Sequence, residues 1–229
     1  MTIPFTQLFQ QSFPELNRKN TGFVDLNDEI QHLNQIIWRS KMSGFDLSQA
    51  QEYSVHQVLE TIVTLGISID PQKKLAFIAG EVDIYNNPVI KMHVGYRGEI
   101  ALATQFNIIK SASANLVFEN DEFKSFGANK EVEHVITSLS TTLRGQCSGG
   151  YCRSVLGNGD ILNATLSIEE MDAIAVSQIE HTMGNTAWNS VWCNEMRKVA
   201  IYRRAAKDWR QRLYANPALK HSLNYTDAA

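Results

Sequence analysis

Apolar residues recur every three or four positions in two segments of the first third of the chain. The first segment spans Leu26 to Ile37, and either Asp25 or Asn27 at its start is a suitable helix cap. The second spans Leu47 to Leu65 and is followed by Gly66. Because side chains at this spacing lie on one face of a helix, the pattern predicts two amphipathic helices.

The pattern changes after residue 74, where β-branched and aromatic residues gather in short runs. Two runs, Leu75–Ile84 and Val89–Val94, flank the turn-forming sequence Asn86-Asn87-Pro88 and predict a hairpin. A short helix is predicted at Glu99–Phe106, where Ile100, Ala101 and Ala103 face inward. The remaining runs predict strands, with a loop between two of them: Ile108–Phe118, Phe123–Phe126, Val132–Thr142 and Tyr151–Leu156, with the loop at Gly145–Gly150.

Helical spacing returns in the last third of the chain. Ser167 and Glu170 form a capping-box sequence, which predicts a helix to about Ile179. After a flexible link at His181–Ala187, the stretch Trp188–Tyr214 contains no Gly or Pro and predicts one long helix. Its apolar residues form a single stripe: Trp192, Met196, Val199, Tyr202, Ala206, Trp209 and Leu213. Helices before and after a mostly antiparallel set of strands predict an α+β fold with helices packed on the sheet.

The length and composition predict one main domain. A chain of 229 residues with 44% hydrophobic content can bury one large core or two small ones, and we assign a single core to residues 25–214. Residues 1–24 contain prolines and polar residues and predict a loosely structured arm, whose Phe5 and Phe9 are available to dock on a neighbouring subunit. Residues 215–229 predict a short, frayed tail.

Charge is distributed unevenly along the chain. Seven basic and two acidic residues lie between Trp192 and Tyr214, a local charge of +5 in a chain of −3, so that the rest carries −8 by difference. Guanidinium groups bind phosphate oxygens bidentately and displace condensed counterions. The last helix therefore predicts a site for a nucleic-acid backbone. A solvated helix face and a surface that binds an acidic protein partner are the alternatives.

Two other motifs carry similar chemistry. Gly95-Tyr96-Arg97-Gly98 lies where a predicted strand meets a predicted helix, and free N–H groups at a helix N-terminus bind anions. Arg144 and Arg153 flank the predicted glycine-rich loop, with Tyr151 between them. Aromatic rings that stack on bases beside phosphate-binding arginines are a common way to hold single strands. A purely structural turn and exposed hairpin residues are the respective alternatives.

Membrane, disulfide-rich and zinc-binding proteins fit the sequence poorly. No apolar run approaches the roughly 18 residues of a membrane span, and the N-terminus lacks the features of a signal peptide, so we expect a cytoplasmic protein without membrane contact. Cys147, Cys152 and Cys193 form neither a disulfide framework nor zinc-ligand spacing, and they are expected to be small core or loop residues. No cofactor or dedicated metal site is predicted.

Signs of an enzyme are weak. The loop at Gly145–Gly150 lacks the Gly-Lys-Ser/Thr ending of a phosphate loop, so nothing supports nucleotide hydrolysis. Glu81 and Asp83 fall on one face of a predicted strand, with Lys91 on the next. This arrangement leaves a small magnesium-dependent nuclease as an alternative, in which the carboxylates bind the metal. Solvated hairpin residues are the simpler explanation.

Four segments, in order, resemble the RecT family of phage single-strand annealing proteins. Val94–Ile109 is similar to the family's strand that ends in a Gly-Tyr-Arg-Gly turn and enters a short helix. Ile62–Pro71 resembles its helix end with Leu-Gly, and Asn120–Phe126 its acidic and aromatic strand. Trp188–Ala205 resembles its Trp-containing helix with Glu-Met and paired basic residues. The resemblance extends over about Leu47–Trp209.

The resemblance implies a Redβ-like annealing core that binds single-stranded DNA without sequence preference and anneals complementary strands in homologous recombination, without nucleotide hydrolysis. It also implies binding of the annealed duplex, homo-oligomers in rings or helical filaments, a partner 5′ to 3′ exonuclease, and a phage or mobile-element origin in a bacterial host. Mg²⁺ is then an influence on annealing rather than a bound cofactor. The residues matched to DNA binding are Tyr96, Arg97, Arg197, Lys198, Arg203, Arg204 and Lys207.

The chain departs from the family pattern in two places. Around Arg144, Tyr151 and Arg153, the sequence Cys147-Ser148-Gly149-Gly150 replaces a charged turn, which makes these three residues weaker DNA-binding candidates. Only about fifteen residues follow Tyr214, whereas family members often have a longer C-terminal segment that binds partner proteins. Partner binding through that region is therefore not expected.

Overall fold

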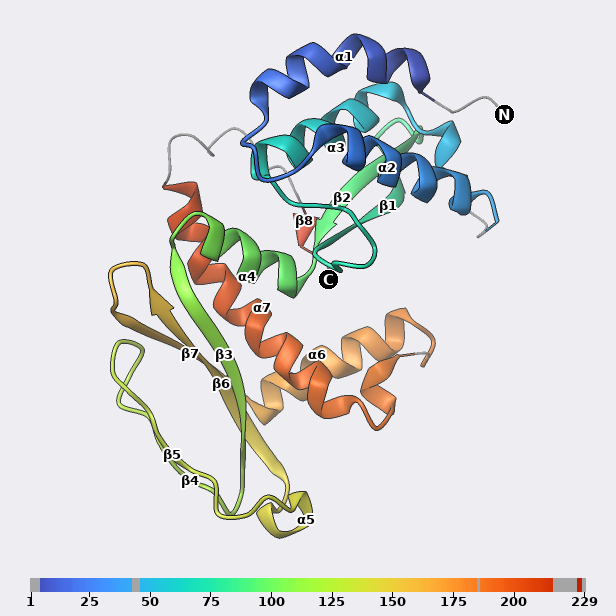
Figure 1. Cartoon of the computed structure of the whole chain (residues 1–229). Coiled ribbons are helices and arrows are strands. Elements are labelled where there is room, and N and C mark those ends of the chain that lie inside the picture. The colour runs from blue at the N-terminus through green and yellow to red at the C-terminus, as the bar shows by residue number, and fades with distance from the viewer. Residues whose placement is uncertain (1–4, 43–45, 185, 216–225, 228–229) are drawn as a thin grey trace. The chain divides into compact units, whose positions relative to one another are not determined.

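The computed structural model describes residues 5–42, 46–184, 186–215 and 226–227 (Figure 1). The chain divides into two compact units, which we call unit 1 (residues 1–102 and 213–229) and unit 2 (residues 103–212). A compact unit is not by itself an independently folding domain. The assignment of one domain to residues 25–214 therefore stays a prediction.

Unit 1 contains three helices and a hairpin. The helices are α1 (Thr6–Lys19), α2 (Leu26–Ser40) and α3 (Glu52–Leu65), with the short 3-10 helix η1 (Leu47–Gln49) before α3. The Asp25 side chain accepts hydrogen bonds from the backbone N–H groups of Asn27 and Asp28, so Asp25 is the cap of α2. The predicted helix at Leu47–Leu65 is interrupted after η1.

Helix α1 corrects the prediction of a loosely structured arm. Phe9 and Leu16 are buried in unit 1, and Lys19 Nζ lies 2.8 Å from Glu60 Oε1 of α3. The backbone N–H of Thr21 also donates to the Val63 carbonyl of α3 at 3.0 Å. The polar residues and prolines of this segment made its helical spacing hard to recognise. The helix is stabilised because its apolar face packs on α3. Phe9 is part of this core and is not an exposed docking residue.

The predicted hairpin is present as β1 (Ala76–Val82) and β2 (Pro88–Val94), paired antiparallel with Ala76 opposite Val94. The short strand β8 (Thr226–Asp227) pairs with β2 in parallel. Most of the predicted frayed tail lies outside the described residues. Helix α4 (Tyr96–Gln105) follows β2 directly and begins three residues earlier than predicted.

Unit 2 is built on an antiparallel sheet in the order β3-β6-β7. Its strands are β3 (Ile109–Phe118), β6 (Cys147–Leu156) and β7 (Ile161–Ser167), and a separate hairpin is formed by β4 (Glu122–Lys124) and β5 (Glu133–Val135). Its helical segments are α5 (Thr141–Arg144), α6 (Ile168–His181), the 3-10 helix η2 (Ala187–Asn189) and α7 (Cys193–Tyr214). The α+β class with antiparallel sheets is confirmed.

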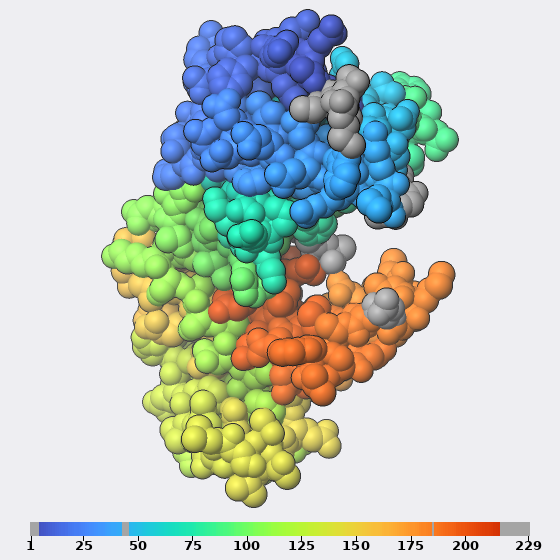
Figure 2. Space-filling view, turned by 45° about the vertical axis from the view of Figure 1, so that its right-hand side comes forward, coloured from blue at the N-terminus to red at the C-terminus, as the bar shows by residue number. Residues whose placement is uncertain are grey.

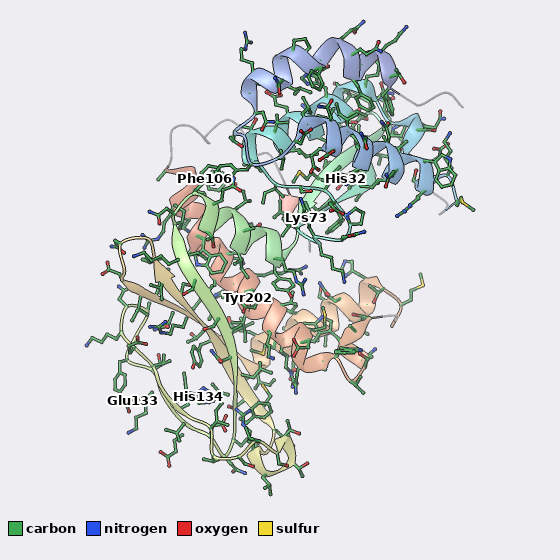
Figure 3. All side chains as sticks on the ribbon, in the orientation of Figure 1. His32, Lys73, Phe106, Glu133, His134 and Tyr202 are labelled. Atoms are coloured by element: carbon green, nitrogen blue, oxygen red, sulfur yellow. The ribbon has the colours of Figure 1, made fainter. Side chains whose placement is uncertain are left out.

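Helix α7 lies against one face of this sheet (Figure 1). The indole N–H of Trp209, which is fully buried, donates to Ser154 Oγ of β6 at 3.2 Å. The hydroxyl of Tyr202 accepts a hydrogen bond from the Ala114 N–H of β3 at 3.2 Å, and Figure 3 shows Tyr202 on the side of α7 toward this strand. The sheet therefore fixes which side of α7 remains exposed.

The strands of unit 2 differ from the prediction in three places. Strand β6 begins at Cys147, within the predicted loop Gly145–Gly150. The reason is packing: a Cβ atom on Gly150 would lie 2.4 Å from Ile201 Cδ1 of α7, so glycine at this position allows the helix to approach. Strand β7 was not predicted, and β5 covers only three residues of the range 132–142.

The long helix also differs from its prediction. Trp188 belongs to η2, and α7 begins only at Cys193. In the predicted apolar stripe, Trp192 is 63% exposed, whereas Trp209 is buried as expected. Ala200 and Ile201, which the predicted stripe does not include, are buried. Trp192 lies one residue before α7 begins, so it is not part of the helix face that packs on the sheet.

Candidate nucleic-acid interface

Three predicted DNA-binding cations of α7 have carboxylate partners in unit 2. Lys198 Nζ lies 2.9 Å from Glu195 Oε1 within the same helix. Arg197 and Arg204 face α6, where their guanidinium nitrogens lie 3.8 Å from Asp172 Oδ1 and 3.7 Å from Glu170 Oε1. These pairs are at least partly exposed and contribute little to stability. A phosphate can therefore replace such carboxylates at small cost.

Arg203 and Lys207 differ from these three cations. Among the described residues, neither side chain has a carboxylate within 4 Å or a hydrogen-bond partner. Lys207 is exposed, whereas Arg203 is half-buried. Burial lowers the pKa of Arg203, and the nearby charge of Arg210 lowers it further. A half-buried guanidinium without an acidic neighbour is a favourable place for an anionic ligand.

Helix α6 borders this part of α7. Figure 2 shows α6 and the first turns of α7 next to each other on the surface of unit 2, in orange and red-orange. Ser167 and Glu170 form the predicted capping box at the start of α6, where the Ser167 hydroxyl accepts from the Glu170 N–H at 3.3 Å. The cap fixes where α6 begins and thereby places Glu170 near Arg204.

Tyr151 and Arg153 lie on the opposite face of the sheet. Side chains alternate along a strand, so Gly150 and Ser154 face α7 while Tyr151 and Arg153 face the β4–β5 hairpin. Tyr151 is only 6% exposed and stacks on Phe123 of β4 with ring centroids 5.3 Å apart. A base can stack on Tyr151 only if the hairpin moves away. Its role in DNA binding stays a prediction.

Arg144 and Arg153 are both paired with acids on this hairpin side. Arg153 Nε donates to Glu131 Oε2 at 2.8 Å. Arg144 Nε donates to Asp121 Oδ1 at 2.8 Å, and its Nη2 also donates to this carboxylate. Asp121 has no exposed side-chain surface, and the Arg144 guanidinium holds its pKa well below the usual range. Arg144 thus neutralises a buried charge inside unit 2.

His134 extends the network around Asp121. Its Nε2 lies 3.1 Å from Asp121 Oδ2 and its Nδ1 3.3 Å from the Tyr151 hydroxyl. In Figure 3, His134 points from β5 toward the sheet, whereas the adjacent Glu133 points away. The hairpin is therefore fastened to the sheet by both polar and aromatic contacts.

Tyr96 and Arg97 belong to unit 1, at the start of α4. Arg97 is exposed, and its Nε donates to the Tyr96 hydroxyl at 3.2 Å. Gly95 N donates to the Leu75 carbonyl at 2.8 Å, and a Cβ on Gly98 would lie 2.3 Å from this same oxygen. The turn therefore requires glycine at position 98 for close packing. A DNA contact by Tyr96 and Arg97 stays a prediction.

The model of the RecT family matches residues 29–213 of the sequence. The chain belongs to the RecT family. Membership associates it with DNA recombination by single-strand annealing. A comparison with curated proteins finds no match. In this RecT-family protein, the matched residues include all ten predicted DNA-binding positions.

The nuclease alternative receives no support from the geometry of this RecT-family protein. Glu81 is paired with Lys91 at 2.5 Å, and Asp83 accepts hydrogen bonds from the N–H groups of Tyr85 and Asn87 in its own turn. Among the described residues, no group of three potential metal ligands occurs, and no helix is long and apolar enough to span a membrane.

The three cysteines are free in this RecT-family protein. Cys147 and Cys152 are buried, and Cys193 is half-buried at the start of α7. Burial raises the pKa of the Cys152 thiol to about 11, so this group is protonated at neutral pH. The prediction of small core residues is confirmed for Cys147 and Cys152.

Sequence reasoning missed several residues beside the α7 cations. Met196 and Val199 were assigned to the buried stripe, and Trp188 to the start of the long helix. In the structure, these three residues line a cavity together with Arg203 and Arg204. No local sequence signal separates these residues from the buried ones, because helical spacing does not show which turns of a helix another element covers.

Proposed function

We propose that this protein binds single-stranded DNA through its phosphates and anneals complementary strands without nucleotide hydrolysis. The observation that carries the proposal is the pair Arg203 and Lys207, one turn apart on α7, which have no acidic partner among the described residues. Arg204 lies between them and has only a long, half-exposed pair with Glu170. Family membership supports the same conclusion.

The mechanism follows from which part of DNA the cations bind. Phosphate contacts give affinity and orientation but carry no sequence information. A strand held in this way presents many of its bases to solvent, where a second strand can test them. Correct Watson–Crick pairing then supplies the free energy of annealing. The protein needs only to hold and align the two strands, and no covalent step is required.

Oligomerisation and partner proteins complete the proposal. Each subunit offers few cations, so several subunits on one strand are needed for stable binding, because linked weak contacts raise the overall affinity. We therefore propose a homo-oligomer, as a ring or a helical filament, that also holds the annealed duplex. A 5′ to 3′ exonuclease is the partner that would produce the single strand. The site of action is the cytoplasm of a bacterial host, because the family is phage-associated.

The remaining predicted residues contribute to the proposed DNA site in different ways. Arg197 and Lys198 extend the α7 surface toward the start of the helix, each with an acidic neighbour. Tyr96 and Arg97 are a second contact point in unit 1. Arg144 and Tyr151 contribute only if the β4–β5 hairpin rearranges, because they are engaged with Asp121 and with Phe123. Arg153 contributes if a phosphate replaces its partly exposed partner Glu131.

The experiment is an annealing assay of two complementary oligonucleotides at low and moderate salt. The wild type should anneal them quickly, whereas Arg203→Ala/Arg204→Ala should anneal slowly and bind single strands weakly. Because each lost phosphate contact lowers the log–log salt slope by about 0.7 for single strands, the slope should fall by about 1.4. A wild type that neither binds nor anneals DNA would refute the proposal.

The matched control is Lys41→Ala/Lys73→Ala. It removes two positive charges from exposed side chains of unit 1 and therefore changes the net charge equally. Annealing by this control should stay near the wild-type rate. Equal losses in both double variants would mean that net charge, and not the position of the α7 cations, determines binding.

A further inference from the structure

A small cavity lies directly beside the α7 cations, wholly within unit 2. Its volume is about 110 Å³. Pockets for drug-sized ligands typically measure about 300–1,000 Å³, so this cavity accepts something much smaller, such as one planar ring. The walls come from β7, α6, η2 and α7, which are the elements nearest to the proposed DNA site.

The walls of the cavity are mostly apolar. Ile174 of α6, Trp188 of η2, and Met196 and Val199 of α7 supply flat or flexible apolar surface. The Trp188 indole N–H donates to Gln178 Oε1 at 3.2 Å, which fixes the ring and satisfies its polar atom. Within the described part of the chain, the Gln178 side-chain nitrogen has no acceptor, so its two N–H donors remain at the wall.

Cations form the rest of the lining. Arg203, Arg204 and Lys207 all border the cavity, and Arg203 is the half-buried member. The site thus combines an apolar slot for a ring, donors for the edge of that ring, and positive charge immediately beside it. A nucleotide has the same three parts in the same order: two apolar ring faces, a polar edge and an adjoining phosphate.

We propose that this cavity holds one unstacked nucleobase of the bound single strand, with its neighbouring phosphate on Arg204 and Lys207. This inference rests on the proposed function and adds a base-dependent contact to it. Ring faces contact Trp188 and Met196, the ring edge accepts from the Gln178 side-chain nitrogen, and Arg203 remains for a phosphate. Apolar contacts with the ring faces tolerate every base, so the pocket does not require sequence preference.

The pocket also distinguishes unpaired from paired bases. A base in a duplex can enter only if it is flipped out of its stack, which costs pairing and stacking free energy. For an unpaired base, the free-energy cost of entering the pocket is much smaller. Pairing with a second strand therefore competes with the pocket, so annealing should empty it and release this one contact.

The first test uses the wild type alone, with oligonucleotides of equal length that either carry all bases or contain a block of abasic sites. Both keep the phosphate charges. The intact oligonucleotide should bind about 10-fold more tightly, as expected when one base loses an aromatic or guanidinium contact. The fluorescence of a 2-aminopurine base in the single strand should change when the protein binds. On annealing, this fluorescence should approach the value of the free duplex. Equal affinities for the two oligonucleotides would overturn the inference.

The second test fills the cavity with Val199→Phe. This variant should bind the intact oligonucleotide about 10-fold less tightly, while its affinity for the abasic oligonucleotide and its salt slope stay as in the wild type. The matched control is Val176→Phe on α6, at a position that is 55% exposed and outside the cavity lining. The control should behave as the wild type does.

The outcomes separate the inference from the proposed function. If the wild type binds single strands and Val199→Phe binds both oligonucleotides as the wild type does, the pocket inference is wrong and the phosphate site stands. If the wild type binds neither oligonucleotide, the proposed function fails and the pocket inference fails with it. The comparison of intact and abasic oligonucleotides decides the matter even if Val199→Phe does not fold.

Discussion

The two faces of the β3-β6-β7 sheet use arginine in opposite ways. On the hairpin side, Arg144 and Arg153 are each bound to a carboxylate, and the charge of Arg144 compensates the fully buried Asp121. On the α7 side, Arg203 is half-buried without an acidic neighbour among the described residues. Arg144 therefore stabilises the protein, whereas Arg203 leaves its charge for a ligand.

The comparison shows why cation counts alone do not locate a binding site. All of these arginines look alike in the sequence, and all lie near glycine or aromatic residues. They differ in what the fold places beside them. Substitutions on each face should therefore affect stability and DNA binding differently.

The largest effect is expected from Asp121→Asn. The change removes the charge that compensates Arg144, whose side chain is only 13% exposed. Leaving one member of a buried ion pair without its partner costs about 3 kcal/mol or more, so the free energy of unfolding in urea should fall by about that amount. Glu133→Ala is the control, because its side chain is 65% exposed and its pair with Lys124 is long, at 3.9 Å. A loss below about 1 kcal/mol would mean that the network is not a stabilising one.

The same carboxyl group predicts a pH dependence. The pKa of Asp121 is lowered in the folded state, chiefly by its hydrogen bonds with Arg144. Its contribution is therefore fully present above the unfolded pKa of about 3.9 and is lost as the pH falls toward the folded value. Between pH 6 and pH 3, wild-type stability should fall more steeply than that of Asp121→Asn. Parallel curves from urea titrations would contradict this assignment.

Arg203→Met should separate stability from DNA binding. Because burial and Arg210 both disfavour the charged form of Arg203, replacing it by an apolar side chain should leave the free energy of unfolding unchanged or raise it by up to about 1 kcal/mol. Affinity for single strands should fall about 10-fold, as for one charge-assisted contact. Lys207→Met, at an exposed position, should weaken binding without any gain in stability. A destabilised Arg203→Met protein would show that this arginine is structural.

The smallest effect is expected from Glu131→Ala. Glu131 is 57% exposed and is the partner of Arg153, so its removal should cost less than about 1 kcal/mol of stability. If Arg153 binds DNA, freeing it should raise the affinity for single strands about twofold, a rim-charge effect. Unchanged affinity, measured in the same titration as for the wild type, would exclude Arg153 from the DNA site.

Elements with local signals were predictable from the sequence. Asp25 caps α2, Ser167 and Glu170 form the box at the start of α6, and the Asn86-Asn87 turn joins β1 and β2. Each of these signals works within a few residues, because the cap or the turn bonds to backbone groups nearby. The α+β class followed from the order of such elements.

Elements that depend on distant contacts were not predictable in this way. Helix α1 contains polar residues and Pro14, and it is held by its packing on α3. The first residues of β6 look like a loop because they are glycine-rich. The lack of a side chain at Gly150 leaves room for Ile201 of α7 to pack against the strand. In both cases the stabilising partner lies far away in the sequence.

The candidate site was also predictable only in part, because some of its features are local and others depend on distant contacts. The position of seven basic residues along the last helix could be predicted, because periodicity and charge can be read directly from residue order. Which arginines remain available for a ligand depends on the packing of the fold. Arg144 meets Asp121 across 23 positions, while Arg203 meets an apolar cavity. Charge is a property of the residue, but its compensation depends on which groups the fold brings within a few ångströms.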